Sequence, residues 1–346
     1  MAKAERIRIY DVARVAGVSV ATASKALNDT GRMTEQTRTR VKQTAAALGF
    51  RPNAMARALT QQRSFAIGLL TNDTYGRFTL PVMAGISEAL VDEGVSVFLC
   101  GIEDDAALAK LHVDAMLDKQ VDGIIATGKR IDRRLPVDLS HLPIPVVYAF
   151  TEGPEDAVTL VSDDAEGARE ACEWLLQLGR THLAHITGPE AFASVTARAA
   201  AFHAVAGAGR PVLHGPWSEA WGHEAVARLW SSNDLPPDAI FCGNDQIARG
   251  VVDALRERGI AVPGDVSVIG FDNWEIVAAA TRPPLTTVDM NLKELGREAG
   301  RLILALAEGK SAEPGIRALP CKLVVRQSCG GDMFAGREKG VALQES

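Results

Sequence analysis

Residues 9–28 read IYDVARVAGVSVATASKALN, and this stretch decides the fold of the N-terminal part of the chain. Val12, Val15 and Ala16 recur at helical spacing, which predicts a short helix with one buried face. Gly17 ends that helix, because glycine tolerates the left-handed backbone of a tight turn. A second helical stretch follows after the turn. A helix, a glycine turn and a second helix together indicate a helix-turn-helix unit.

The start of the second helix of such a unit faces base edges in the major groove of DNA. Val20 and Ala21 offer only apolar contact there, for example to a thymine methyl, whereas Lys25 can donate to guanine. Ser19 is predicted to be the N-cap of this helix. The polar side chains suited to phosphate contacts are those of Tyr10, Ser19, Thr22, Ser24 and Asn28. A purely structural role stays open for Thr22, Ser24 and Asn28.

A third helix is predicted from an N-cap at Thr34 to Leu48, and a conditional fourth helix follows it. Pro52 interrupts the chain, and Asn53 can cap a helix that reaches Leu59. About seven residues are too few for a stable helix in water. We therefore expect this segment to be helical only when a partner is bound.

Charge is distributed unevenly along the 346 residues, whose formal net charge is −6. Residues 1–63 hold 12 Lys/Arg and 4 Asp/Glu, a balance of +8, so the remainder holds 25 and 39, a balance of −14. A basic head on an acidic body is typical of a DNA-reading module joined to a second function. The alternative is a basic segment that binds nothing in particular.

Several functional classes are disfavoured by what the sequence lacks. The five cysteines form no C-x-x-C pair, which argues against a zinc site or a disulfide framework and favours reduced thiols in the cytoplasm. The N-terminus has no apolar signal region, and no apolar run is long enough to span a membrane. No G-x-G-x-x-G, P-loop or G-x-S-x-G motif occurs. We therefore expect no enzyme activity, no cofactor and no metal.

From residue 64 onward, apolar strand patterns alternate with helical ones, and the alternation restarts after about residue 162. This pattern predicts an α/β body of two doubly wound parallel lobes, each with helices on both faces of its sheet. Ligands of such sheets bind beyond the carboxyl ends of the strands. Two facing lobes would place those ends around a shared cleft that closes by hinge motion.

Strand ends supply candidate ligand-binding residues. Asp272 follows a buried strand and can accept hydrogen bonds from vicinal hydroxyls, and Trp274 could stack on a sugar face. Asn244 follows another strand and is expected to face the ligand, whereas Asp245 is expected to cap the next helix. Arg198 stands near the start of a helix.

Residues 9–28 and the run Arg51-Pro52-Asn53 to Ala58-Leu59 closely resemble the LacI/GalR family of bacterial repressors, and the resemblance spans about residues 9–328. It implies that Leu59 wedges between base pairs of the minor groove, and that Met55 and Ala56 lie in a paired hinge helix. It also implies a periplasmic-binding-protein-like body. The pocket positions that it implies are Phe78, Thr79, Arg198, Trp217, Asn244 and Asp272.

One segment departs from the family pattern. Tyr148-Ala149-Phe150 stands where the family commonly has a polar pair that contains an aspartate, such as Asp-Arg, so a hydroxyl-binding carboxylate is missing. The aromatic residues expected at the pocket are Phe78, Tyr148, Phe150, Trp217 and Trp274. Aromatic walls with a few polar groups suit a saccharide, and a nucleobase is the lesser alternative.

These observations predict a transcription regulator, most simply a repressor, that acts as a homodimer on pseudo-palindromic double-stranded operator DNA under the control of a small-molecule effector. The alternatives are a sugar-binding protein without DNA regulation, and the same regulator with a nucleobase or a co-repressor protein as effector.

The sequence also predicts how the chain is divided into domains. The expected divisions are a head at 1–51, a hinge helix and linker at 52–63, a first lobe at 64–161 and 291–319, a second lobe at 162–290 and 320–329, and a disordered tail at 330–346 without a leucine heptad.

Overall fold

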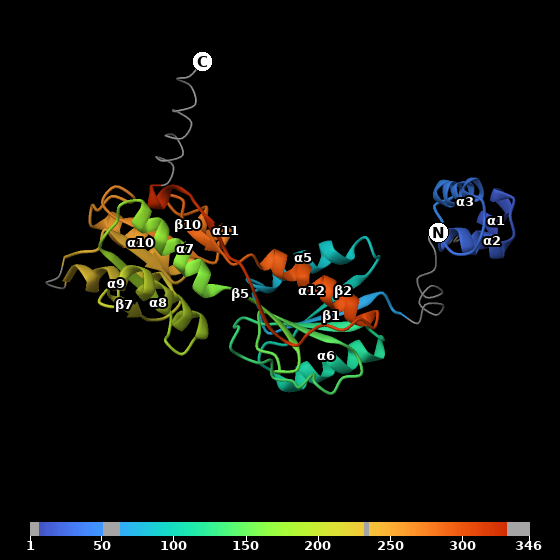
Figure 1. Ribbon diagram of the computed structural model, residues 1–346, viewed down its shortest axis with the longest axis horizontal. Coiled ribbons are helices and arrows are strands. Elements are labelled where there is room, and N and C mark those ends of the chain that lie inside the picture. The colour runs from blue at the N-terminus through green and yellow to red at the C-terminus, as the bar shows by residue number, and fades with distance from the viewer. Residues whose placement is uncertain (1–6, 51–62, 232–234, 331–346) are drawn as a thin grey trace, which may run out of the picture. The chain divides into compact units, whose positions relative to one another are not determined.

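The computed structural model describes residues 7–50, 63–231 and 235–330 (Figure 1). It contains two compact units, a head, Met1–Phe65, and a body, Ala66–Ser346. The predicted hinge residues Asn53, Met55, Ala56 and Leu59 lie outside the described residues, and so does the predicted tail beyond Gly330. The expectations for those segments therefore stay predictions.

The head consists of the helices α1 (Ile9–Ala16), α2 (Val20–Leu27) and α3 (Glu35–Ala47). Gly17 ends α1 with φ 65°, and the Ser19 hydroxyl caps α2 by accepting a hydrogen bond from the Thr22 amide at 3.0 Å, both as predicted. The prediction for Val15 is wrong, since this residue is 59% exposed. Ala13 instead joins the small core, because α2 and α3 cover the side of α1 that it occupies. The buried residues of this core are Val12, Ala13, Ala16, Ala23, Ala26, Val41 and Ala45.

The first lobe of the body is built on a six-stranded sheet in which every strand pairing is parallel. In spatial order its strands are β11 (Gly315–Leu319), β5 (Val158–Ser162), β4 (Val146–Ala149), β3 (Gly123–Thr127), β1 (Ala66–Thr71) and β2 (Ser96–Gly101). The helices α5 (Thr79–Leu90), α6 (Ala106–Asp118) and α12 (Leu292–Ala307) pack around it. Helices α5 and α12 meet closely because Gly85 and Gly296 carry no side chain; a Cβ at Gly85 would lie 1.9 Å from the Lys293 carbonyl oxygen.

The second lobe repeats this plan on another six-stranded sheet, in which only the pairing of β12 with β10 is antiparallel. In spatial order its strands are β12 (Lys322–Val324), β10 (Thr286–Asp289), β9 (Ser267–Phe271), β8 (Ala239–Cys242), β6 (Leu183–Thr187) and β7 (Val212–His214). Its helices are α7 (Asp164–Gln177), α8 (Ala193–Ala206), α9 (Glu219–Ser231), α10 (Asp245–Glu257), α11 (Glu275–Ala278) and the short η1 (Gln327–Cys329).

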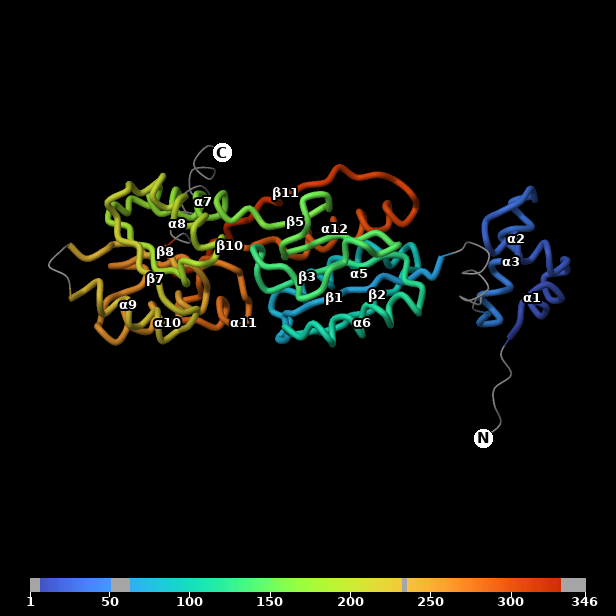
Figure 2. The backbone as a smooth tube through the Cα atoms, turned by 90° about the horizontal axis from the view of Figure 1, so that it is seen from below, coloured from blue at the N-terminus to red at the C-terminus, as the bar shows by residue number. Residues whose placement is uncertain are grey.

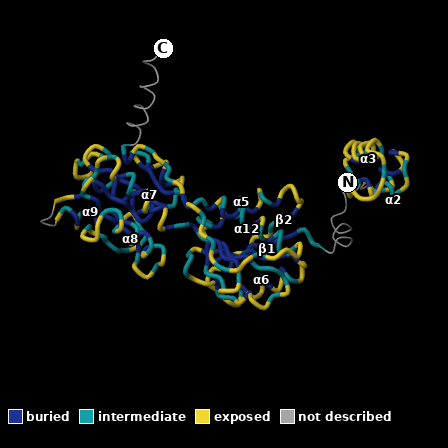
Figure 3. The backbone as a smooth tube through the Cα atoms, viewed as in Figure 1, coloured by how far each residue is buried: buried dark blue, intermediate teal, exposed yellow. Residues whose placement is uncertain are grey.

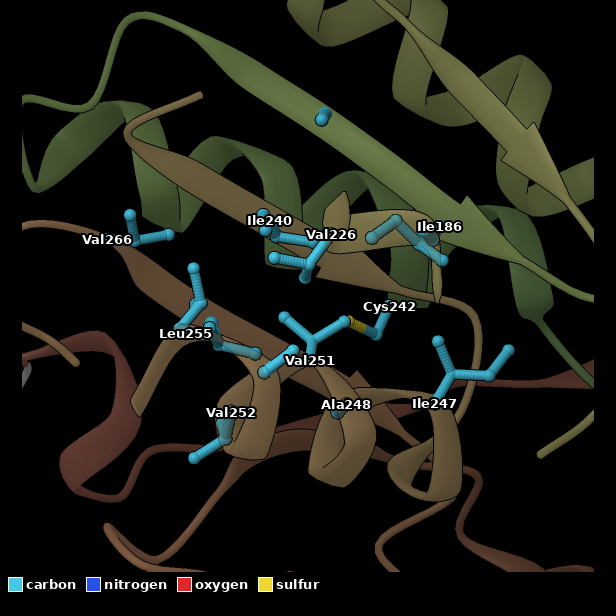
Figure 4. Packing of buried hydrophobic residues seen from close by; sticks show 14 of the residues in the cluster. Ile186, Val226, Ile240, Cys242, Ile247, Ala248, Val251, Val252, Leu255 and Val266 are labelled. Carbon is cyan, nitrogen blue, oxygen red and sulfur yellow. The ribbon is translucent and has the colours of Figure 1, made fainter. Parts of the chain in front are cut away.

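Burial explains why these sequences form strands between helices. Both faces of a doubly wound parallel sheet are covered, so its inner strands are apolar along their whole length. All six residues of β1 are buried, and apolar residues of β8 and α10 pack together in the second lobe (Figure 4). Exposed positions gather on the outer surfaces of the helices and loops (Figure 3). No helix within the described ranges is long and apolar enough to cross a membrane.

The chain passes between the lobes three times (Figure 2). Hydrogen bonds join these crossings. They follow β5, β10 and β11. The Ser162 hydroxyl donates to the Met290 carbonyl at 2.8 Å, and the Asp163 amide donates to the Leu319 carbonyl at 2.8 Å. The Asn291 side chain reaches the Pro320 carbonyl at 3.3 Å. The three crossing segments therefore form one hydrogen-bonded connection between the lobes.

Candidate functional site

A cavity of about 350 Å³ opens between the two lobes. The residues that line it lie in the segments that follow the carboxyl ends of the parallel strands, where open α/β sheets bind their ligands. The first lobe and the crossings supply Arg77, Phe78, Lys129, Arg130, Ile131, Asp132, Arg133, Phe150, Asp164 and Met290, and the second lobe supplies Phe192, Ser194, Arg198, Trp217, Asn244 and Asp272.

Arg198 is held rigidly at the cavity wall, where its side chain is 5% exposed. Its Nε and Nη2 both donate to one carboxylate oxygen of Asp164, at 2.8 and 2.5 Å. Its Nη1 donates to the Gly243 carbonyl, and its guanidinium carbon lies 3.5 Å from the centroid of the Phe271 ring. A planar donor fixed in this way can present its remaining edge to a ligand without loss of side-chain entropy.

Arg77 connects the two lobes at the cavity. It comes from the loop after β1 and donates to Asp272 after β9 and to the Gln246 side chain of α10, the latter at 2.9 Å. Its guanidinium carbon lies 4.5 Å from the centroid of the Trp274 ring, which is a cation–π contact. Burial raises the pKa of Asp272, and the charge of Arg77 partly offsets this rise.

Arg130 and Asp132 make a second connection between the lobes. Arg130 pairs with both oxygens of Asp132 at 2.9 Å and also donates to the Ala191 carbonyl at 3.1 Å. Asp132 in turn accepts a hydrogen bond of 2.7 Å from the Ala193 amide at the start of α8. The Arg130 guanidinium lies 3.6 Å from the centroid of the Phe192 ring. Both lobe-to-lobe connections thus include residues of the cavity wall, so a ligand there contacts the groups that join the lobes.

Aromatic side chains from both lobes form the apolar walls. Phe78 and Phe150 stack with their centroids 4.9 Å apart, and Phe192 meets Trp217 edge to face at 5.8 Å. Phe150 has φ 58° and Asp272 has φ 99°, conformations that are costly for residues with a Cβ. Such strain gathers at binding sites, and here it occurs at the ends of β4 and β9, one strand from each lobe.

Six of the nine predicted effector residues line the cavity, namely Phe78, Phe150, Arg198, Trp217, Asn244 and Asp272. The structure places the other three elsewhere. Tyr148 packs into the apolar core behind β4, because the unusual backbone of Phe150 turns only that residue toward the cavity. Thr79 is buried against Thr71, with their hydroxyls 2.7 Å apart. Trp274 does not line the cavity, and its ring lies against the Arg77 guanidinium.

The structure gives Asn244 a capping role in addition to its expected place at the cavity, and it corrects the expected role of Asp245. Asn244 caps α10 by accepting a hydrogen bond of 2.8 Å from the Ile247 amide. Asp245 is fully buried and accepts hydrogen bonds from the Trp274 amide at 2.7 Å and the Thr287 hydroxyl at 2.5 Å. Asn244 therefore lies at the cavity as predicted, but as the helix cap, while Asp245 holds the Trp274 loop.

Sequence reasoning missed most of the charged residues of the cavity. Arg77, Arg130, Asp132 and Asp164 all follow first-lobe strands, so their strand-end positions were the available signal. Arg77 and Arg130 lie in loops without a recognisable motif, where a pattern gives no indication of a side chain's partner. Asp164 is followed directly by a helical pattern and reads as an ordinary first-turn carboxylate.

Comparison with known proteins agrees with this architecture. Residues 8–53 match the family described as bacterial regulatory proteins, lacI family, and residues 172–329 match the periplasmic binding protein-like domain. The HTH-type transcriptional regulator DegA of Bacillus subtilis is 34% identical over 330 residues, which cover 92% of this chain and 97% of that protein.

The chain belongs to the LacI family.

Solved structures extend the likeness to this LacI-family chain as a whole. A lac repressor dimer bound to operator and the anti-inducer ONPF matches with a TM-score of 0.70 at 26% identity, over 94% of this chain and 99% of that one. A complex of the transcriptional regulator CelR with cellobiose matches with a TM-score of 0.64 at 26% identity, over 93% and 100%. The protein is a DNA-binding transcriptional regulator, not an enzyme, with an effector-binding body of the periplasmic-binding-protein type.

The head of this LacI-family regulator leaves several of its predicted DNA-reading residues open to solvent. Ser19, Ala21, Lys25 and Asn28 are exposed on or beside α2, and Tyr10 is 68% exposed at the start of α1. Val20, Thr22 and Ser24 are partly buried. The Ser19 and Thr22 hydroxyls lie 2.8 Å apart, so these two predicted phosphate ligands also bond to each other.

Proposed function

We propose that this regulator is a homodimeric repressor whose affinity for a pseudo-palindromic operator changes when a saccharide binds between its lobes. One observation carries the proposal: the connections made by Arg77 and by Arg130 with Asp132 join the lobes at the cavity wall. A ligand in the cavity must interact with these groups. If these groups interact differently in the liganded and unliganded states, ligand binding in the cavity is coupled to DNA binding by the head.

The chemistry of the wall supports a saccharide. Sugars present apolar ring faces and a rim of hydroxyls, which call for aromatic surfaces and for fixed carboxylate, amide and guanidinium groups. The cavity offers the Phe78–Phe150 stack and Trp217 together with Asp272 and Asn244. The structural likeness to a cellobiose complex of CelR is consistent with this choice.

A dimer is supported by the edge of the first lobe. Strand β2 pairs only with β1 among the described strands, and its Phe98 and Leu99 are 44% and 43% exposed. An exposed apolar edge strand invites pairing unless another surface covers it. A two-fold dimer would present two heads to two half-sites, which is why a pseudo-palindromic operator is expected.

The proposal is tested with full-length protein and an operator selected from random DNA. Fluorescence anisotropy measures operator affinity with and without members of a saccharide panel, and with purines as the comparison class. We expect one or a few saccharides to change operator affinity by about 5- to 150-fold, the usual range of allosteric coupling. The variant Arg198→Lys keeps the charge but loses the planar fork, so it should lose this response and retain operator affinity. A response to purines alone would reject the saccharide.

A further inference from the structure

The charges of the cavity wall do not balance. Each of its three carboxylates already forms an ion pair with an arginine. The pairs are Asp272 with Arg77, Asp132 with Arg130, and Asp164 with Arg198. Two further cations of the wall, Lys129 and Arg133, have no carboxylate within it. This surplus stands against the background of the sequence, in which residues 64–346 carry a balance of −14. A cationic wall in an acidic body is the reverse of what random placement would give.

Lys129 and Arg133 both belong to the segment that follows β3, and hydrogen bonds fix the backbone of this segment to its neighbours. The Lys129 amide donates to the Asn72 side chain at 3.2 Å. The Arg133 carbonyl accepts a hydrogen bond of 2.8 Å from the Thr151 hydroxyl and one of 3.3 Å from the Glu152 amide. The segment therefore carries its two charges on a fixed backbone, which reduces the ordering cost of binding.

A carboxylate outside the wall, Asp104, pairs with Lys129, so among the described residues Arg133 is the cation of the wall without an ion-pair partner. The Lys129 ammonium lies 2.9 Å from Asp104, which also accepts a hydrogen bond from Asn72. The pKa of Asp104 is lowered, chiefly by the Lys129 hydrogen bond and further by the charge of Arg133. Arg133 is exposed, and its guanidinium makes no hydrogen bond with any residue in the described part of the chain. Its five donors therefore remain free for a ligand at the cavity mouth.

We propose that the effector is an acidic saccharide, whose carboxylate or phosphate binds Arg133 beside the Lys129–Asp104 pair while its ring lies among the aromatic walls. The inference rests on the proposed function and names the ligand class of the same cavity. Arginine binds a carboxylate or a phosphate through two parallel hydrogen bonds, and these charge-assisted bonds are the stronger ones. The anionic group lies on the first-lobe side, and Asn244 and Asp272 face the ring hydroxyls from the second lobe.

Matched trios of ligands test the inference on full-length protein by isothermal titration calorimetry. Each trio is a hexose, its uronate and its 6-phosphate, for example glucose, glucuronate and glucose 6-phosphate, and the panel covers the common hexoses. We expect an acidic member to bind at least about tenfold tighter than its neutral parent, and the uronate and phosphate arms identify which anion is preferred. Added salt should weaken the acidic member and leave the neutral one unchanged.

Arg133→Gln should bring the affinities of the acidic member and its neutral parent to within about threefold of each other, because it removes the charged fork and little else. Arg134→Gln is the matched control: it is also exposed, but it pairs with Glu152 and lies outside this cavity. The inference would be overturned if both variants lost the preference for the acidic ligand equally, or if neutral ligands bound as tightly as acidic ones. Neither result would contradict the proposal that a saccharide controls the repressor. If neither class binds and no member of the saccharide panel changes operator affinity, both proposals are overturned.

Discussion

Arg77 in the loop after β1 forms an ion pair with Asp272 after β9, across the cavity between the lobes. The side chains of the two residues are 17% and 8% exposed, so the pair is largely withdrawn from water. An effector that uses Asp272 for its hydroxyls must compete with Arg77 for the same carboxylate. The pair is therefore a contact that favours the connected arrangement of the lobes and that ligand binding must alter.

Removing one partner of this pair should be costly. Arg77→Met leaves Asp272 buried without its cation, and we expect the unfolding free energy of the body to fall by about 3 kcal/mol. The exposed pair of Lys110 with Asp114 provides the control, since Lys110→Met should cost less than about 0.5 kcal/mol. All five tryptophans lie in the body, so denaturant unfolding followed by tryptophan fluorescence measures both variants. Equal effects would show that the Arg77 pair does not stabilise the body.

The buried Asp245 predicts how the stability of the body depends on pH. Burial, together with the charge of Asp272, raises the pKa of Asp245 to about 8 from an ordinary value of 3.8. Between about pH 4 and pH 8 the folded body retains a proton that the unfolded chain releases, so this contribution to stability is lost as pH rises through that window. Asp245→Asn should flatten that decline in denaturation curves taken from pH 5 to pH 8.5. A decline of unchanged slope in the variant would exclude Asp245 as its source.

The cap of α2 should control the stability of the head. Ser19→Ala removes the acceptor for the Thr22 amide, which should cost about 1 kcal/mol. Ser19→Asn supplies another side-chain oxygen and should restore most of that loss. Hydrogen exchange of the α2 amides, measured by mass spectrometry on the full chain, reports the difference. Exchange that is unchanged in the alanine variant would mean that packing alone holds this helix.

The edge strand β2 is expected to lie in the dimer interface. Phe98→Arg places a charge on that apolar edge and should convert the dimer to a monomer, because an unpaired charge is expensive to bury. Leu111→Arg on α6 is the matched control, since Leu111 is 66% exposed on a different element. Sedimentation equilibrium gives the mass of each variant. A Phe98→Arg protein that remains dimeric would place the interface elsewhere.

Many of the principal elements of the fold follow from local patterns. The caps at Ser19 and Thr34 and the turn at Gly17 depend on neighbouring residues only, so the sequence predicts them correctly. Strands with weaker patterns were not predicted, including β5 and the short β7, β11 and β12, because pairing with neighbours in the sheet defines them. Helix α12 was also missed, although Leu292, Leu295, Ala299 and Ile303 repeat at helical spacing.

The amino-acid sequence by itself determined a helix-turn-helix head, a two-lobed α/β body and the strand ends at which ligand-binding groups gather, since these depend on periodicity and on residue type. Only the tertiary structure decided which charges meet. Arg77 and Asp272 are 195 residues apart, and Arg130 reaches a carbonyl 61 residues away. Such pairings arise because the tertiary structure brings the carboxyl ends of the two sheets together, and a local sequence pattern contains no information about residues so far apart in the chain.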